Sequence, residues 1–456
     1  MNPQIIKNRE EIVSHGNCKG REITVDIIER AIMAVNGYEL TKKAVYIRDN
    51  KLIIKDLVYD LSRLRNIYVI GAGKATFSIT QALDEILGEN ISRGLIIVKD
   101  DETMKLRNIE VVRASHPMPN EDGLEGARRV LEIARMARDG DLIFCLITGG
   151  ASALMPMPAG IGISLEDLIR VTELLLSCGA TIEEINCVRN HIELLKGGKL
   201  LRYIHPGAEV IGLIIVDEVA GLPWGPTVPD TTTFADAISV LKRYDLLEKT
   251  PPSIIKHLRR GLKDPSLENP RPEEFRDRRV HNIVLADNRI MCEAAKERAE
   301  ELGLKSLILT TVLEGESRDA GIVLASIAKE VERRGQPISP PCALIAGGET
   351  TVTLSGECGK GGPSQELVVA AALKIAGSKL ITVASIDTDG TDGPTDAAGG
   401  IVDGYTLERA RREGIDLFEC LKRHNCYEAL KALGDAIITK QTGTNVMDLN
   451  VLVIAE

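Results

Sequence analysis

The sequence has few aromatic residues and no long hydrophobic run. Aromatic side chains make up 3% of the 456 residues, and the longest apolar stretches, such as residues 210–216, fall far short of the roughly 20 residues that span a bilayer. The opening residues, MNPQIIKNRE, contain no apolar core of the kind found in a secretory signal. We therefore expect a cytoplasmic protein that has no membrane partner.

Positive charge is also scarce. The chain has 56 lysines and arginines against 66 aspartates and glutamates, which gives a formal net charge of −10. A surface that binds nucleic acid or an anionic membrane concentrates basic side chains. The composition therefore argues against both as the main partner. The sequence leaves the oligomeric state open, with a homodimer as one option.

Two motifs that would define a site are absent from the sequence. The nine cysteines occur singly, with no C-x-x-C pair, which opposes a zinc site and a disulfide framework. Neither GAGKAT nor GECGKGG has the G-x-x-x-x-G-K-[ST] spacing of a Walker A loop. A P-loop kinase is therefore disfavoured.

Strands and helices alternate on both sides of one polar, proline-bearing segment, residues 261–279. Because 456 residues exceed one ordinary core, we predict two domains, residues 1–270 and 271–456. Each is predicted to be an α/β domain with a largely parallel sheet flanked by helices, the N-terminal one Rossmann-like. The apolar runs that predict buried strands are residues 67–70, 94–98, 110–113, 141–147, 210–216, 282–286, 306–311, 342–346, 379–385 and 450–454.

An acidic loop follows the strand predicted at residues 379–385. Residues 384–404 read ASIDTDGTDGPTDAAGGIVDG and contain Asp387, Asp389, Asp392 and Asp396 among glycines. Open α/β sheets bind ligands at the carboxyl ends of their strands. Four close carboxylates favour a bound cation or nearby basic side chains, although the calcium-loop spacing is not met. The alternative is a solvated polar turn.

Glycine-rich turns recur where predicted strands meet helices, at residues 71–73, 148–150, 347–348 and 359–362. The unpaired N–H groups at the start of a helix favour anions. One such turn is ordinary in this fold class, but several beside an acidic loop suggest a ligand that carries phosphates together with Mg²⁺.

The turn IGAGKATF resembles part of a dinucleotide-binding fingerprint. Gly71 and Gly73 are present, but Thr76 replaces the third glycine, and Asp100 stands where a ribose-binding acid is sought. Lys74 places a cation beside a predicted helix start, where it could hold an anion. A solvent-facing lysine is the alternative.

Other candidates are weaker when each is taken alone. Arg318 follows two glutamates at a strand-to-helix turn and is either a phosphate clamp or half of a surface ion pair. Asp217 ends a buried strand, as a metal ligand or base would. His116 and His191 are better explained as structural residues, and residues 196–199 (KGGK) as capping at the end of a helix.

Longer motifs occur in order from Gly71 to the end of the chain, and together they resemble one family, the glycerate 2-kinases of the MOFRL group. The motifs are VIGAGKAT, SHPMPNEDG, LITGGASAL, NCVRNHIELLKGGKL, GPTVPDTTTFADA, ASIDTDGTDGPTDAAGG and TGTNVMDL. The resemblance implies two α/β domains with the active site in the cleft between them. It implies ATP and a divalent cation such as Mg²⁺ as cosubstrates, and D-glycerate as the acceptor that becomes 2-phosphoglycerate.

On this resemblance Lys74 and Arg318 are the catalytic residues, and we add Asp389 to them. The full assignment gives Ser115, Gly150 and Ser152 to substrate binding, Gly347, Gly348, Glu349, Thr350, Gly361 and Gly362 to nucleotide binding, and Asp217 and Asp387 to the metal.

The sequence departs from the family pattern in three segments. The loop after Asp217 (VDEVAGLPWGPT) is shortened, the segment GKGGPSQE lacks two of the family's arginines, and Lys440-Gln441 precede TGTN where glycine and proline are common. Two other functions stay open. One is reduction of hydroxypyruvate with a nicotinamide cofactor, and the other is metabolite binding without catalysis.

Overall fold

The computed structural model describes residues 4–99, 105–160, 162–219, 224–354, 356 and 358–455. Its contacts divide the chain into two compact units. We call residues 37–215 with the described part of 222–285 the central unit. Residues 4–36, 216–219 and 286–455 form the terminal unit, which contains both ends of the chain. These units differ from the predicted segments 1–270 and 271–456, because the first helices pack with the C-terminal half.

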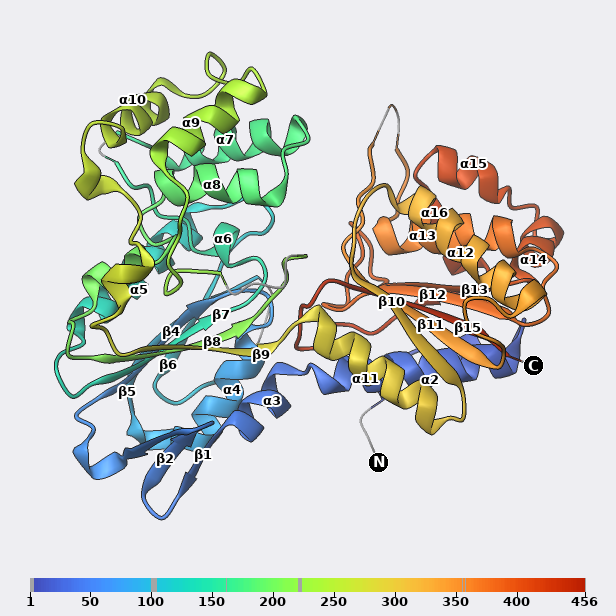
Figure 1. The fold of residues 1–456 in the computed structure, drawn as a ribbon, viewed down its shortest axis with the longest axis horizontal. Coiled ribbons are helices and arrows are strands. Elements are labelled where there is room, and N and C mark those ends of the chain that lie inside the picture. Colours follow the sequence, from blue (N-terminus) through green and yellow to red (C-terminus); the bar gives the residue numbers. More distant parts are fainter. Residues whose placement is uncertain are drawn as a thin grey trace. The chain divides into compact units, whose positions relative to one another are not determined.

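The central unit is built on a six-stranded sheet in the order β6-β5-β4-β7-β8-β9 (Figure 1). The strands are β4 (Ile67–Ala72), β5 (Ile91–Val98), β6 (Ile109–Arg113), β7 (Leu142–Ile147), β8 (Glu209–Ile215) and β9 (Val280–Ala286). β4 to β8 pair in parallel, and β9 follows β8 in the same direction through hydrogen bonds from Val210 N and Val216 N. The predicted parallel, Rossmann-like sheet is confirmed. Its central strands are buried along their whole length, which explains their continuous apolar sequences.

Helices cover this sheet and also form a layer of their own. α4 (Thr76–Leu87) and α5 (Glu121–Met136) pack on the sheet. The short α6 (Ala151–Leu154) follows β7. A separate apolar core holds together α7 (Leu165–Ser177), α8 (Ile182–Ile192), α9 (Phe234–Arg243) and α10 (Pro252–Gly261), which stack beyond the sheet in Figure 1. A small antiparallel sheet of β1 (Val45–Arg48), β2 (Lys51–Ile54) and β3 (Leu57–Asp60), preceded by α3 (Gly37–Ala44), was not expected from the sequence.

The terminal unit corrects one prediction, because its sheet is mostly antiparallel. The strand order is β10-β11-β15-β12-β13-β14. In the described sheet β10 pairs with β11 in parallel, and the other neighbouring strands pair antiparallel. The strands are β10 (Lys305–Leu313), β11 (Cys342–Gly348), β12 (Ile381–Asp387), β13 (Gly399–Asp403), β14 (Ala436–Ile437) and β15 (Asp448–Ile454). β15 is buried throughout and enters between β11 and β12 in the opposite direction. A strand buried on both faces is continuously apolar in either orientation, so its sequence does not reveal its direction.

Both faces of this second sheet are covered by helices (Figure 1). α2 (Cys18–Ala34) and α11 (Asn288–Glu301) lie on one face. The other face carries α12 (Ser317–Arg334), α13 (Pro363–Ile375), α14 (Thr406–Arg412), α15 (Leu417–Lys422) and α16 (Cys426–Ala432).

A fully buried arginine fixes α2 in the terminal unit. Arg21 donates from Nε to Asp403 at 2.5 Å and from Nη1 to Asp435 at 2.8 Å. A buried arginine needs such partners, because an unpaired buried charge is strongly destabilising. These ion pairs therefore explain why the first helices belong to the C-terminal half.

Candidate active site

The turn that carries Lys74 joins β4 to α4 and is held by backbone hydrogen bonds. Lys74 N donates to Gly149 O at 2.8 Å, and Ala75 N donates to Thr148 Oγ1 at 3.0 Å. Gly73 has φ +140°, and a methyl group on it would lie 2.1 Å from Thr148 Oγ1. Only glycine allows so close an approach in this conformation. The predicted glycine turns at residues 71–73 and 148–150 are therefore packed against each other and hydrogen-bonded at the carboxyl edge of the sheet.

The same edge brings together Lys74, Gly150 and His116. A methyl group on Gly150 would come within 3.2 Å of Lys74 Cγ and 2.9 Å of His116 Cδ2. Gly150 also has φ +84°, a region that favours glycine. His116, which the sequence suggested was structural, thus faces the predicted substrate-binding residue. Ser115 precedes it, is exposed, and donates its N–H to Asn120 Oδ1 at 3.2 Å.

The carbonyl oxygen of Ser152 is held by two basic side chains that sequence reasoning missed. Arg189 Nη2 donates to it at 2.8 Å and Lys196 Nζ donates at 3.3 Å. Glu193, which is buried, accepts from Arg189 Nε at 3.3 Å and from Lys196 Nζ at 2.5 Å. This group fixes the short helix α6, which begins directly after Gly150. All three side chains lie in the motif NCVRNHIELLKGGKL, which was the available signal.

The segment KGGK does not cap a helix, since α8 ends at Ile192, four residues before Lys196. Gly197 and Gly198 have φ +59° and +80°, and the lysines on either side turn inward and are buried. Burial lowers the pKa of Lys196 to about 7, an effect that Arg189 strengthens and Glu193 opposes. Burial likewise lowers the pKa of Lys199 to about 7. Lys199 Nζ donates to Asn190 O.

In the terminal unit, acidic residues meet where β11 and β12 end and β15 begins. Asp387 and Asp448 are register partners across β12 and β15, and Gly348 pairs with Asp448 on the other side. Burial, with the nearby carboxylates of Asp387 and Glu349, raises the pKa of Asp448 well above its usual range. Asp448 was missed from the sequence, where it is the next-to-last residue of the motif TGTNVMDL.

These carboxylates provide hard oxygen ligands but not a complete metal cage. In the described part of the chain, no group of three or more His, Cys, Asp or Glu side chains is arranged to hold a metal ion. Mg²⁺ is commonly bound by one or two protein carboxylates, with water and substrate phosphates supplying the other ligands. The pair Asp387 and Asp448 fits that requirement, because a cation would relieve the repulsion between two carboxylates.

The other aspartates of the acidic loop have separate partners. Asp389 lies just after β12 and accepts from Thr391 N at 2.8 Å. Asp392 caps α13 by accepting from Ser364 N at 3.2 Å and from Gln365 N at 2.9 Å. Burial raises the pKa of Asp392 to about 7 despite these two donors. Asp392 therefore has a structural role, and the loop is more than a solvated turn.

Three of the predicted nucleotide-binding glycines, Gly347, Gly348 and Gly362, are tightly packed, whereas a methyl group on Gly361 would come no nearer than 3.4 Å to another residue. A methyl group on Gly348 would lie 2.2 Å from Leu313 N, and one on Gly362 would lie 2.3 Å from Asp392 Oδ1. Several backbone donors beside them already have protein acceptors. Glu349 N donates to Leu313 O at 2.9 Å, and Thr350 N donates to the Asp448 carboxylate. Close packing thus accounts for Gly347, Gly348 and Gly362 but not for Gly361. A phosphate-binding role for residues 347–350, Gly361 and Gly362 stays a prediction.

Arg318 stands in the first turn of α12 with its side chain half exposed. Its Nε lies 3.5 Å from Asp319, so this ion partner is not one of the two preceding glutamates. Glu316 instead accepts from Thr353 N and Thr353 Oγ1. Both Glu316 and Arg318 line a pocket of about 700 Å³ in the terminal unit. Asp217 follows β8 by two residues, at the strand end where it was predicted.

Two family models cover most of the chain. Residues 23–259 match a domain of unknown function, DUF4147, and residues 342–448 match the MOFRL family. The chain is therefore a two-part α/β protein that combines these domains. It belongs to the glycerate kinase family, and the resemblance inferred from its motifs is confirmed.

Relatives match the chain over nearly its full length. A glycerate 2-kinase of Pyrococcus horikoshii is 44% identical over 95% of this chain and 97% of its own. The crystal structure of a glycerate kinase from Thermotoga maritima superposes with a TM-score of 0.79, at 35% identity, over 95% of this chain and 99% of that one. A protein of Agrobacterium vitis, provisionally named a hydroxypyruvate reductase, is 37% identical over 85% of this chain and 98% of its own.

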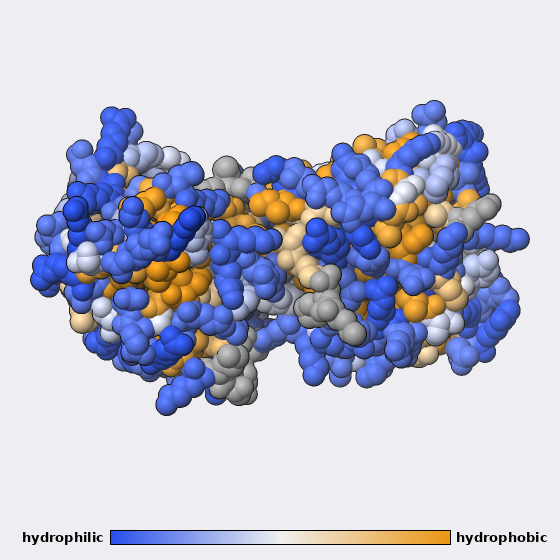
Figure 2. All heavy atoms as spheres, turned by 90° about the horizontal axis from the view of Figure 1, so that it is seen from below, coloured by the Kyte–Doolittle hydropathy of each residue, from blue (hydrophilic) through white to orange (hydrophobic). Residues whose placement is uncertain are grey.

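Within the described ranges, no helix is both long and apolar enough to cross a bilayer. Hydrophilic side chains dominate the face drawn in Figure 2, and apolar side chains form separate patches within each unit.

Proposed function

We propose that this protein transfers the γ-phosphoryl group of ATP to the C2 hydroxyl of D-glycerate and releases 2-phosphoglycerate and ADP. One observation carries the proposal, namely the 44% identity to a glycerate 2-kinase across 95% of the chain. The contacts around Lys74 and Ser152 add support, because they order side chains from the same motifs on which the resemblance rests.

The central unit is proposed to bind glycerate. Lys74 supplies a cation next to the start of α4, where its charge and the helix dipole favour the glycerate carboxylate or the phosphoryl group. Gly150 keeps the adjacent space open, and Ser115 and Ser152 provide polar groups beside it. His116, which lies against Gly150, joins this set as a further contact.

The terminal unit is proposed to act on the phosphoryl group. Arg318 stabilises its equatorial oxygens, and Asp389 accepts the C2 hydroxyl proton. Asp387 and Asp448 would hold Mg²⁺, with Asp217 as a further ligand, and a cation bound there would supply positive charge to balance the phosphates. Phosphoryl transfer depends on positioning and positive charge more than on covalent chemistry, and these residues supply both.

Substitution tests these roles directly. Lys74→Met and Arg318→Ala are each expected to lower kcat/KM for D-glycerate by about a thousandfold, since each removes a charge that balances the phosphoryl group. Arg334→Ala is a matched control, because Arg334 sits at the other end of α12, is exposed, and pairs with Glu330. Near-normal turnover in either folded variant would refute its assigned role.

Hydroxypyruvate reduction is the second candidate, supported by the name of the Agrobacterium vitis relative. The Lys74 turn opposes it, because Thr76 occupies the third glycine position and its Oγ1 lies 3.3 Å from Thr148 Oγ1. Asp100, the proposed ribose acid, lies outside the described residues. Metabolite binding without catalysis is the third candidate.

One pair of assays separates the three candidates. ADP release from ATP, Mg²⁺ and D-glycerate, without NADH oxidation on hydroxypyruvate, is the result expected of the kinase. NADH oxidation without ADP release would establish the reductase. Ligand-induced stabilisation with neither activity would leave the binding protein.

A further inference from the structure

The pocket that contains Arg318 has features that no predicted role explains. It has a volume of about 700 Å³ and lies beside the first turns of α12, the last turns of α13, and α15. Its described lining residues are Glu316, Arg318, Ile322, Thr353, Ala370, Leu373, Lys374, Phe418, Leu421, Lys422 and His424.

One part of the pocket is apolar. Phe418 is 64% exposed and Ile322 is 40% exposed, and both line the cavity with Leu373 and Leu421. Large apolar side chains grouped in an open pocket commonly mark a binding site. The ring of Phe418 offers a flat surface on which a nucleotide base can stack.

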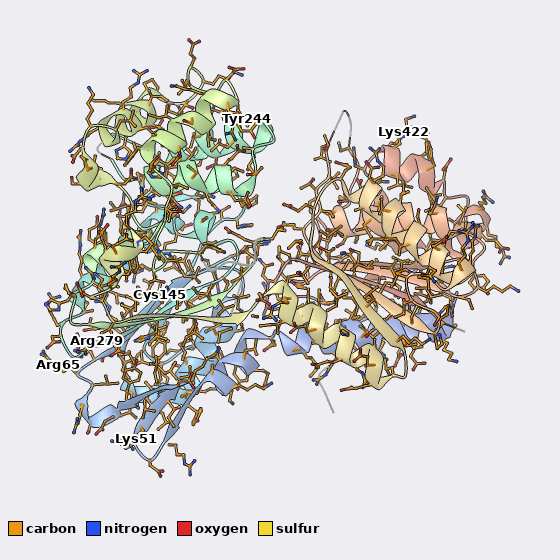
Figure 3. The ribbon with its side chains drawn as sticks, in the orientation of Figure 1. Lys51, Arg65, Cys145, Tyr244, Arg279 and Lys422 are labelled. Atoms are coloured by element: carbon orange, nitrogen blue, oxygen red, sulfur yellow. The ribbon has the colours of Figure 1, made fainter. Side chains whose placement is uncertain are left out.

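The polar part of the pocket is mostly cationic. Arg318, Lys374 and Lys422 are the lysines and arginines among the described lining residues, and Glu316 is the carboxylate. The Glu316 oxygens already accept hydrogen bonds from Thr353. Lys422 stands at the end of α15, on the outer side of this helical layer (Figure 3). The pocket therefore combines a stacking surface with excess positive charge, which suits an anionic aromatic ligand.

His424 is fixed at the same pocket. It has φ +50°, and its Nδ1 lies 2.7 Å from Glu366 Oε1. Glu366 is buried, and burial raises the pKa of its carboxyl while His424 opposes that rise. The imidazole is therefore held by a buried partner, and it forms an ordered polar part of the pocket lining.

We propose that this pocket binds the nucleotide of the kinase reaction. The base lies between Phe418 and Ile322, and the phosphates extend past Lys422 and Lys374 toward Arg318. This inference rests on the proposed kinase function and assigns the nucleotide to side chains of α12, α13 and α15. In this assignment the glycine-rich turns at residues 347–348 and 359–362 do not have to bind the phosphates. This agrees with their contacts, since several backbone N–H groups beside these glycines already donate to acceptors within the protein.

Calorimetric titration of the full chain with ADP and Mg²⁺ tests the proposal, because ADP binds without turnover. Phe418→Ala should weaken ADP binding by about tenfold, the loss expected when one base loses its aromatic partner. Tyr405→Ala is the matched control, since Tyr405 is an exposed aromatic residue of the same unit that is not among the pocket residues.

A second pair of variants isolates the charge. Lys422 and Arg423 are adjacent, and both lie 3.6 Å from the carboxylate of Glu419, but only Lys422 lines the pocket. Lys422→Ala should weaken ADP binding about threefold, whereas Arg423→Ala should leave it within twofold.

The outcomes separate this inference from the proposed function. If all four variants bind ADP as the wild type does while glycerate is phosphorylated, the pocket assignment is wrong and the kinase stands. If the wild type neither binds ADP nor phosphorylates glycerate, the kinase function is wrong and the nucleotide pocket falls with it. If Phe418→Ala dissolves a dimer and leaves ADP affinity unchanged, the pocket is a contact between two copies of the chain, which also overturns the proposal.

Discussion

Arg189 donates a 2.8 Å hydrogen bond to the main-chain carbonyl of Ser152, 37 residues earlier in the chain. This bond ties α8 to α6, the short helix that begins directly after Gly150. Because the Arg189 guanidinium is mostly buried and also bonds Glu193, it fixes α6 more firmly than an exposed side chain would. We infer that Arg189 is a positioning residue for the glycerate site.

Replacing Arg189 should therefore impair catalysis, although Arg189 is not proposed to contact the substrate. We expect Arg189→Met to lower kcat/KM for D-glycerate by about tenfold or more, since small displacements of positioning groups are costly. Arg189→Lys keeps the cation and should recover part of this loss. Steady-state kinetics with separate kcat and KM values measure the effect.

Arg170→Met is the control for that experiment, because Arg170 is an exposed arginine of α7 that pairs with Glu173. It should behave as the wild type. If folded Arg189→Met kept full activity, the hydrogen bond from Arg189 to the Ser152 carbonyl would not be required for catalysis, and the positioning role of Arg189 would be wrong.

Gly150 gives a second prediction, because glycine is required there for two reasons. Gly150→Ala places a methyl group 2.9 Å from His116 Cδ2 and 3.2 Å from Lys74 Cγ, at φ +84°. We expect a loss of about 1 kcal/mol of stability from the strained backbone and a large fall in glycerate turnover from the displaced side chains.

The control is Gly162→Ala. Gly162 has φ +85°, and among the described residues that are not its chain neighbours none comes within 4 Å of the added methyl group, so it reproduces the backbone strain alone. Thermal unfolding and turnover are measured for both variants. Equal activity in the two would show that the contacts of Gly150 with Lys74 and His116 do not matter for catalysis.

The buried lysines predict how stability depends on pH. Burial lowers the pKa of Lys199 in the folded protein to about 7, whereas an unfolded lysine holds its proton up to about pH 10.4. Between these values the unfolded state binds more protons, so stability rises with pH across this window, and the contribution is constant below it. The slope is on the order of 1.4 kcal/mol per pH unit while the native amine is neutral.

Lys199→Met removes the part of the pH dependence of stability that comes from the Lys199 amine. Denaturant unfolding across the window should show a smaller rise in stability for the variant than for the wild type. Lys296→Met is the control, because Lys296 is a partly exposed lysine of α11, and its slope should match the wild type. Parallel slopes for Lys199→Met and the wild type would mean that the buried amine stays charged.

Much of the fold could be predicted from the sequence, because buried strands and glycine turns leave local patterns. The strands before Lys74, Thr148 and Asp387 are apolar runs that end in turn residues, and the structure contains all three. The sequence did not predict whether β15 runs parallel or antiparallel to its neighbours. β15 is buried on both faces, so its side chains do not alternate between apolar and polar, and a continuous apolar run is compatible with either orientation.

The parts of the site that depend on long-range contacts were also not predictable from local patterns. The sequence placed Lys74 and Gly150 in similar turns, but it did not show that His116 lies against them. Nor did it show that Arg189 and Lys196 meet at Ser152, because those side chains converge only after α8 has packed. The ion pairs that bring Arg21 to the C-terminal half are likewise invisible before folding.

The position of the phosphoryl group on the product tests the central claim most directly. The protein is incubated with ATP, Mg²⁺ and D-glycerate, and the product is offered to enolase with or without phosphoglycerate mutase. We predict that enolase alone consumes it, since enolase acts on 2-phosphoglycerate. A product that enolase consumes only after the mutase has acted would place the phosphoryl group on C3, and the absence of any phosphorylated product would contradict the kinase function itself.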